Sequence, residues 1–480
     1  MVKDLFLFII VSAFCSVIYA QADDTIPVGI HQEQSEYYSL KADSILSKAL
    51  VQTTMPGPIN YLKAGSLSHL VYGWHPYWAS SAAYQNYDYS ALTHISYFSF
   101  EVDTATGSYS NLRGWNTTPI IDYAHQRGVK VTLTVTNFGS ARNIKILSDT
   151  VKQYTLISNI IQQLKARNGD GVNFDFETVP LSQKANMVAF CKRAVRLIKA
   201  QLPAAEISLA TPAVDWSGAW DYNALADICD YLIIMGYNYY YSGSSTAGPV
   251  APLIGESQNV TKSIDTYLNA GVPPEKLLLG VPWYGYDWPV SSADRKAAST
   301  GAGTARFYNA AEALAETYGK ELDATTKVPW LSYNSSSWRQ LWYDDSLSLS
   351  LKNDLVINKD IAGIGIWALS YDGGRSEIWG SIKASYGGEG PDRCMIVSIS
   401  PNPVITSSRI RYYIPAAGQV TLRIIDVSGA TRAVLVNHYL EAGYYDVAIA
   451  SDDFSTGVYY CVLQVGKEHT SKMIAVLRRI

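Results

Sequence analysis

The residues best suited to chemistry lie in one short segment, Asp170-Gly-Val-Asn-Phe-Asp-Phe-Glu177. Because side chains alternate between the two faces of a β-strand, Asn173, Asp175 and Glu177 would all point to one side of such a strand. The two phenylalanines between them would point to the other side. A buried carboxylate without a partner costs several kcal/mol, so an inward row of acids is unfavourable unless the acids are used.

Two carboxylates spaced two residues apart on one face also perturb each other. Like charges at close range cannot both ionise easily, so the pKa of one of them rises. A carboxylic acid that stays protonated near neutral pH can act as a general acid, as in glycoside cleavage. The segment therefore predicts Glu177 as a catalytic acid. The alternative from the residues alone is a salt-bridged strand end or a cap for the following helix.

The rest of the chain predicts a frame that could hold this segment. Eight short apolar runs alternate with helical stretches such as Val151–Arg167 and Leu181–Gln201. Strands separated by helices pair in parallel through right-handed crossovers, so we expect an α/β fold of the (β/α)8 TIM-barrel type. A doubly wound sheet is the alternative, but the chain lacks a glycine-rich dinucleotide fingerprint. The predicted strands are Val71–His75, His94–Phe100, Val131–Thr136, Gly171–Phe176, Ile207–Thr211, Tyr231–Gly236, Leu277–Val281 and Ile361–Ala368.

A barrel would place the polar row at a working position. The row would face the barrel axis and end with Glu177 at the C-terminal rim, where barrel enzymes carry out their chemistry. The phenylalanines would pack against the surrounding helices. The longer gap from Tyr286 to Ser332, with Ala305–Tyr318 inside it, predicts an insertion after the seventh strand.

The spacing D-G-x-N-x-D-x-E at 170–177 resembles the fourth-strand signature of glycoside hydrolase family 18, which includes chitinases and endo-β-N-acetylglucosaminidases. Three other predicted strand ends resemble further motifs of that family. The resemblance covers about Ser66 to Tyr386 and is similar to the branch of spore-cortex and spore-germination hydrolases. The segments that carry it are Met235–Asn238 (M-x-Y-D), Gly280–Gly285 (G-x-P-x-Y-G), Gly365–Leu369 (the last strand, ending in Trp), His75–Trp78 and Trp342–Asp345.

The resemblance implies a mechanism and a set of residues. Glu177 would protonate the leaving oxygen while the 2-acetamido oxygen of the substrate attacks, giving an oxazolinium ion and net retention. Asp175 would orient the acetamido group, Tyr237 would donate its hydroxyl to the attacking oxygen, and Trp367 would form the floor under the sugar. No cofactor and no metal is implied. Further substrate-binding positions are Asn173, Asn238, Trp283, Tyr284, Trp74 and Asn137.

Three positions depart from the commonest family pattern. Asn173 and Asn238 stand where many members have Asp, and Thr136–Gly139 replaces an S-x-G-G segment. Because Asn173 removes a carboxylate with which Asp175 could share a proton, we expect an altered acidic limb of the pH profile. Together the departures argue against a standard processive chitinase without excluding action on chitin oligomers.

The ends of the chain predict export. Lys3 followed by an apolar run from Leu5 to Ala20 is typical of a secretory signal peptide, and no later stretch has the pattern of a transmembrane segment.

The net charge of -4 gives no basic field for nucleic acid. Cys394 and Cys461 could pair, or all four later cysteines could be buried thiols. The expected organisation is a signal peptide (1–22), an N-terminal extension without deducible function and with a helical pattern around Tyr37–Leu50 (23–65), a catalytic barrel (66–387), a linker (388–394) and a β-sandwich (395–480).

The last segment resembles the sorting domain of type IX secretion cargo. The resemblance rests on Ser400–Pro403, Asp426–Gly429, Ser455–Tyr460 and the ending at Lys472-Met473. It implies the type IX machinery as a partner and a protein that is released or attached to the cell surface. A carbohydrate-binding β-sandwich is the alternative.

Three functional hypotheses follow. The leading one is a secreted retaining hydrolase of glycans that contain β-linked N-acetylglucosamine, such as chitin-type oligomers or peptidoglycan, with N-linked glycans as an alternative substrate. A noncatalytic chitinase-like sugar-binding protein is the second, but such proteins typically lack the glutamate that stands at Glu177. A structural surface protein is the third, and it leaves the acid row unexplained.

Overall fold

The computed structural model describes residues 28–40, 67–387, 394–400, 402–441 and 443–477. The predicted signal peptide, most of the predicted extension and nearly all of the predicted linker lie outside these residues. Among the residues described, no helix combines the length and apolar character that a membrane span requires. The predicted domain boundaries therefore stay predictions.

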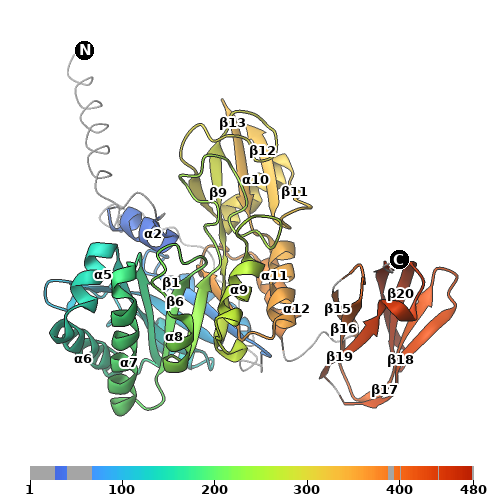
Figure 1. The fold of residues 1–480 in the computed structure, drawn as a ribbon, viewed down its shortest axis with the longest axis horizontal. Coiled ribbons are helices and arrows are strands. Elements are labelled where there is room, and N and C mark those ends of the chain that lie inside the picture. Colours follow the sequence, from blue (N-terminus) through green and yellow to red (C-terminus); the bar gives the residue numbers. More distant parts are fainter. Residues whose placement is uncertain (1–27, 41–66, 388–393, 401, 442, 478–480) are drawn as a thin grey trace.

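The eight predicted runs form a closed parallel barrel, as expected (Figure 1). The sheet closes because the first strand pairs in parallel with both the second and the last. A short antiparallel strand, β3 (Tyr109–Asn111), extends the sheet beside β2. The barrel strands are β1 (Leu70–Pro76), β2 (His94–Val102), β4 (Lys130–Phe138), β5 (Gly171–Glu177), β6 (Glu206–Pro212), β7 (Tyr231–Met235), β8 (Leu277–Pro282) and β14 (Gly363–Trp367).

Helices cover the outside of the barrel and fix the orientation of β5. The β5 side chains Phe174 and Phe176 both pack on Phe190 of α7 (Lys184–Gln201), with ring centroids 5.1 and 5.4 Å apart. Burying these aromatic rings is strongly favourable, and it turns the alternate positions of β5 toward the barrel axis. The other helices over this surface and at the barrel ends are α4 (Ile120–His125), α5 (Ser140–Leu147), α6 (Thr150–Arg167), α8 (Tyr222–Ile228), α9 (Val260–Asn269), α11 (Ser346–Asn358) and α12 (Ser376–Tyr386).

The predicted insertion after the seventh barrel strand is a small antiparallel sheet with one helix, α10 (Tyr308–Tyr318). It begins two residues earlier than Tyr286 and runs to Tyr343, because its last strand pairs with its first. Asp287, fully buried in this sheet, accepts hydrogen bonds from Arg306, Arg339 and Tyr333. The strands are β9 (Tyr284–Pro289), β10 (Thr304–Phe307), β11 (Glu321–Leu322), β12 (Pro329–Asn334) and β13 (Trp338–Tyr343).

The N-terminal extension contains a helix, α2 (Ile30–Ser39), that lies against the barrel (Figure 1). The described helix shares only Tyr37–Ser39 with the pattern predicted from Tyr37 to Leu50, and residues 41–50 of that pattern lie outside the described residues. The start of α2, Ile30–Glu36, was not predicted as helical, because α2 carries few apolar residues and is anchored mainly by polar and aromatic contacts. Those contacts lie at the C-terminal rim of the barrel.

The C-terminal segment forms two antiparallel sheets of three and four strands around their own apolar core. The segment predicted as a β-sandwich contains seven strands in the residues described. Cys394 and Cys461 are buried free thiols here, as are Cys191 and Cys229 in the barrel. The strands are β15 (Met395–Ser400), β16 (Ser407–Ile414), β17 (Gly418–Asp426), β18 (Thr431–Leu440), β19 (Gly443–Ala450), β20 (Gly457–Val465) and β21 (Glu468–Val476).

Candidate active site

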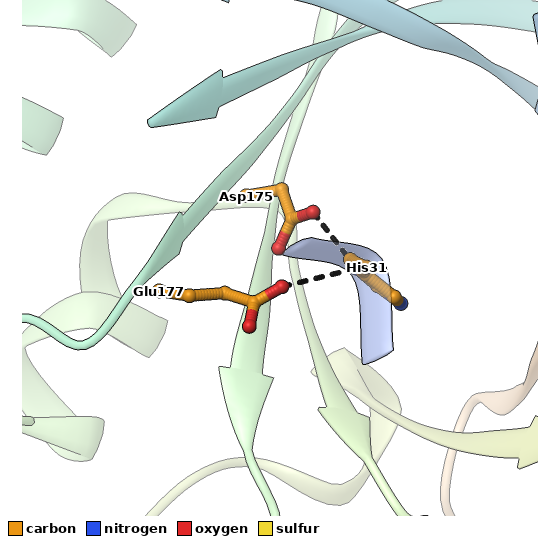
Figure 2. Close-up of side chains that lie close together, drawn as sticks. All are labelled: His31, Asp175 and Glu177. Atoms are coloured by element: carbon orange, nitrogen blue, oxygen red, sulfur yellow. Dashed lines mark hydrogen bonds and ion pairs between the residues drawn. The ribbon is translucent and has the colours of Figure 1, made fainter. Parts of the chain in front are cut away.

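The side chains of the two acids of β5 lie together in one buried site at the C-terminal rim of the barrel. Asp175 is fully buried and Glu177 is 5% exposed. Both carboxyls face the same imidazole, that of His31 on α2 (Figure 2). Nδ1 of His31 lies 2.8 Å from Oδ2 of Asp175 and 3.7 Å from Oε1 of Glu177. The strand alternation predicted from the sequence is therefore the arrangement in the structure.

Burial sets the protonation of Glu177. Loss of solvent raises the pKa of this carboxyl well above its usual value, and the neighbouring Asp175 raises it further. A backbone hydrogen bond from Gln32 opposes these effects without reversing them. Glu177 therefore holds its proton at a pH where an ordinary glutamate is ionised, which is the state that a general acid requires.

Asn173 lies on the same face of β5, deeper in the barrel. Its Oδ1 accepts a hydrogen bond from the indole of Trp74 at 3.1 Å, and its amide donates to Oγ of Ser208 at 2.9 Å. Both Asn173 and Trp74 are fully buried. Neither lines the open part of the site.

Tyr237 and Asn238 follow the end of β7 and line the site. The Tyr237 hydroxyl lies 2.7 Å from Nε2 of His31. Asn238 has a left-handed backbone with φ of 59°, and its Oδ1 accepts a hydrogen bond from the hydroxyl of Tyr284. Asparagine tolerates this conformation better than most residues, so Asn238 fixes the turn that points Tyr237 inward.

Trp367 ends the last barrel strand and provides a flat aromatic surface within the site. Its ring is stacked against the imidazole of His31, with centroids 3.7 Å apart and planes at 29°. Phe98 and Trp78 pack edge-on against the Trp367 indole. The rotamer of this tryptophan is thus held by a neighbour on β2 and another in the loop after β1, as a fixed stacking platform requires.

Two predicted substrate-binding residues lie away from this cluster. Trp283 is fully buried, packs edge-on against Trp379 of α12 and does not line the cleft. Its neighbour Tyr284 points the other way, toward Tyr237. Asn137 is also buried, and its amide donates to Asn143, which in turn donates to the backbone carbonyl of Glu177. Asn137 therefore positions the end of β5 through Asn143.

A cleft of about 470 Å³ opens beside Glu177. It includes Glu177, Tyr237 and Asn238, and its wall contains Trp216, whose side chain is 62% exposed. The sequence analysis did not single out Trp216. A tryptophan in the loop after the fifth barrel strand could have been noticed, because barrel enzymes build their sites from these loops.

His31, Asp175 and Glu177 are also residue types that bind metal ions, with candidate ligand atoms within 4.8 Å of one another. The His31 imidazole is already in direct hydrogen-bond contact with Asp175 and with Tyr237. These contacts use both ring nitrogens, so the arrangement is that of a hydrogen-bonded imidazole. His31 itself was not predicted from the sequence.

Comparison with known proteins gives the class of the protein. The family model described as Glycosyl hydrolases family 18 matches residues 73–372, which is more than half of the chain. This protein belongs to glycoside hydrolase family 18 and is a glycoside hydrolase by family.

Three curated proteins illustrate which relatives this chain resembles. The chain is 28% identical over 270 residues to a putative sporulation-specific glycosylase of Bacillus subtilis, covering 53% of this chain and 61% of that protein. It is 25% identical over 337 residues to mouse di-N-acetylchitobiase, covering 62% of this chain and 85% of the relative. It is 26% identical over 303 residues to a cortical fragment-lytic enzyme of Bacillus anthracis, covering 58% of this chain and 65% of that protein.

A solved structure supports the fold. A family 18 chitinase from Cycas revoluta in complex with (GlcNAc)3 superimposes with a TM-score of 0.60 at 20% identity, covering 66% of this chain and 99% of that one. At this identity the likeness shows the barrel fold alone. The substrate has to be argued from the site.

Proposed function

We propose that this protein hydrolyses glycans containing β-linked N-acetylglucosamine by substrate-assisted catalysis with retention. Glu177 protonates the leaving oxygen, and the 2-acetamido oxygen of the substrate displaces it at the anomeric carbon. Asp175 accepts the acetamido N–H and stabilises its developing positive charge. Tyr237 donates its hydroxyl to the attacking oxygen. The observation that carries the proposal is the convergence of buried Glu177, Asp175 and Tyr237 around the position of the His31 ring, which is stacked on Trp367.

The position of the acids supports the substrate-assisted route. A two-carboxylate retaining enzyme needs acid and nucleophile on opposite sides of the scissile bond, with the carboxyls roughly 5 Å apart. Here both acids come from one strand and contact the same imidazole nitrogen. Such an arrangement suits one acid for the leaving group and one for the acetamido group, so the nucleophile comes from the substrate.

The substrate class rests on the cleft and on the relatives. Aromatic rings in and beside the site offer flat faces for pyranose C–H groups, and the relatives are named as a chitobiase and a cortical fragment-lytic enzyme. We therefore expect chitin-type oligomers or peptidoglycan as substrates, with N-linked glycans as the alternative. A noncatalytic sugar-binding role is disfavoured because Glu177, Asp175 and Tyr237 are all present in the site.

The proposal is tested with purified full-length protein on chitin oligomers, peptidoglycan and a glycoprotein. Glu177→Gln keeps the shape of the site and removes the acid, so we expect turnover to fall by roughly 10²–10⁴-fold. An oxazoline-mimicking thiazoline should inhibit the wild type strongly. Equal turnover by the variant would refute the role of Glu177, and indifference to the thiazoline would indicate a two-carboxylate route.

We also propose that the protein is exported through its N-terminal signal and released or surface-attached through residues 395–480. The apolar run after Lys3 and the motifs of the C-terminal segment support this assignment. A cell with a type IX secretion machinery that expresses the chain without residues 395–480 should retain it in the periplasm. Normal release of the shortened chain would contradict the sorting role.

A further inference from the structure

The N-terminal helix α2 occupies the place where the proposed function puts a sugar. The His31 ring is stacked on the Trp367 indole, with 3.7 Å between centroids. One helical face continues along the same aromatic surface, because Tyr38, seven residues later, stacks on Trp78 with planes at 11°. A sugar cannot stack on Trp367 while His31 is there.

The hydrogen bonds of His31 engage the groups proposed to hold the acetamido group. Nδ1 pairs with Asp175 at 2.8 Å, and Nε2 pairs with the Tyr237 hydroxyl at 2.7 Å. The imidazole is fully buried between them. It thus contacts the same three surfaces, a ring floor, a carboxylate and a phenol, that a bound N-acetylated sugar would need.

Other residues of α2 hold the rim of the site. Oε1 of Gln34 accepts hydrogen bonds from the Trp367 indole at 3.0 Å and from the Tyr371 hydroxyl at 2.6 Å. The Glu33 carboxyl accepts from the Tyr286 hydroxyl at 2.9 Å. Because Tyr286 belongs to β9 and Trp367 to β14, the helix bridges the barrel and its insertion. Contacts to two separate elements make this a specific docking.

The chain also fits closely around the catalytic acid. A Cβ atom added to Gly29 would lie 1.6 Å from Oε2 of Glu177, and the backbone N–H of Gln32 donates to the same carboxyl. Gly29 has φ of -69°, which any residue can adopt, so the need for glycine here is steric. The start of α2 therefore covers the carboxyl group of Glu177.

We propose that residues 28–40 are an autoinhibitory segment that competes with the glycan for the active site. The inference rests on the proposed function and adds its regulation. The segment is joined to the barrel by its own chain, so it competes as a tethered ligand at high effective concentration. Glycan affinity is then reduced by the fraction of molecules in which the site is open.

The proposal predicts that opening variants bind glycan more tightly. All are made in the full chain carrying Glu177→Gln, so that binding is measured without turnover. Gly29→Ala introduces a clash with position 177, and His31→Ala removes the stacked ring and two hydrogen bonds. Each should raise the affinity for chitotriose by roughly tenfold or more in isothermal titration calorimetry. Leu40→Ala, which changes a side chain that is 88% exposed at the end of the helix, is the matched control and should bind like the parent.

A readout on the helix itself separates this proposal from the proposed function. Hydrogen exchange should be slow in residues 28–40 of the wild type and of Leu40→Ala, and fast in Gly29→Ala and His31→Ala. Fast exchange in the wild type would overturn autoinhibition. If the helix is released in the variants but no variant binds glycan, the proposed substrate class is refuted. Autoinhibition of that reaction is then refuted as well. Released helices with unchanged chitotriose affinity would overturn autoinhibition alone.

Activity gives the sign that distinguishes an inhibitor from a catalytic group. With Glu177 intact, His31→Ala should increase kcat/KM for chitin oligomers, because His31 blocks the site. A decrease in kcat/KM, together with release of the helix, would instead make His31 part of the catalytic machinery and overturn the proposal. A synthetic peptide of residues 28–40 should inhibit the Gly29→Ala enzyme competitively, and the same peptide carrying His31→Ala should inhibit it less.

Discussion

At the residue scale, the chemistry depends on what surrounds Glu177. Burial and the adjacent Asp175 raise its pKa, which favours the protonated form of the Glu177 carboxyl. The same features make the glutamate costly for folding. A carboxyl whose folded-state pKa lies above its unfolded value contributes stability below the unfolded pKa, and that contribution is lost as the pH rises toward the folded value.

Glu177→Gln should therefore stabilise the protein in a pH-dependent way. Near pH 4, below the unfolded glutamate pKa of about 4.3, the two proteins should melt at similar temperatures. As the pH rises to 7, the melting temperature of the variant should increasingly exceed that of the wild type, because glutamine has no proton to lose. Melting curves across this range measure the difference. Glu321→Gln, at an exposed position of β11, is the control and should show no such trend.

A second prediction at this scale concerns Asn173. Its Oδ1 already accepts from the Trp74 indole, so Asn173→Asp would add a third carboxylate to the row, beside Asp175 and Glu177, without changing its shape. A like charge next to a carboxyl raises its pKa, so a new carboxylate beside Asp175 should make that side chain ionise at a higher pH. The acidic limb of kcat/KM should therefore move to higher pH. Ser208→Ala, which removes a hydrogen-bond partner of Asn173 and of Tyr72 but adds no charge, should leave the limb in place.

At the element scale, each part of the site comes from a different strand end. The acids come from β5, Tyr237 follows β7, and Trp367 ends β14. The insertion adds Tyr284 and Tyr286 from β9, which contact Asn238 and α2. The sheet of the insertion therefore has to be firm for the rim of the site to keep its shape.

The buried carboxylate of Asp287 should be critical for that sheet. It accepts hydrogen bonds from two arginines and a tyrosine on three different elements. Asp287→Ala should lower the free energy of unfolding by about 2–3 kcal/mol, because it strands these donors, although both arginines can still reach water. Chemical denaturation measures this loss. Asp294→Ala, at an exposed position in the same insertion, should change stability by less than about 0.5 kcal/mol.

At the scale of the whole molecule, the barrel and the C-terminal sheets have separate apolar cores. Residues near the two ends of the barrel segment also contact each other. The backbone N–H of Ser68 donates to the carbonyl of Tyr386, and the Tyr386 side chain is fully buried. Each part thus has the contacts that an independently folding unit needs.

A chain that ends at Gly387 should fold and keep the activity of the full chain. Its melting temperature should stay within a few degrees, because the barrel core loses none of its members. The measurement is thermal unfolding together with kcat/KM on chitin oligomers. A chain that ends at Thr178 instead would lack half of the barrel strands and should not fold. Loss of activity on removing residues 388–480 would mean that the C-terminal segment contributes to the site.

The sequence by itself determined the barrel and the acid row. Eight strands buried on both faces appear as apolar runs, and the two-residue alternation around Phe174 and Phe176 is a local property of an extended chain. The insertion was also predicted, but its end at Ser332 was placed 11 residues before Tyr343, because the pairing of β13 with β9 is a long-range contact. Tyr284 and Trp283 show the limit of this reasoning, since the motif named both and the alternation of the chain turned only Tyr284 toward the site.

Only the tertiary structure decided what fills the active site. His31 and Asp175 are 144 residues apart, and neither the composition nor the periodicity of residues 23–65 indicates their contact. Docking of α2 depends on shape and on matched donors and acceptors from several distant strands. Such complementarity arises only when the barrel has formed, because until then the tryptophan floor, the carboxylate and the tyrosine hydroxyl do not lie close together.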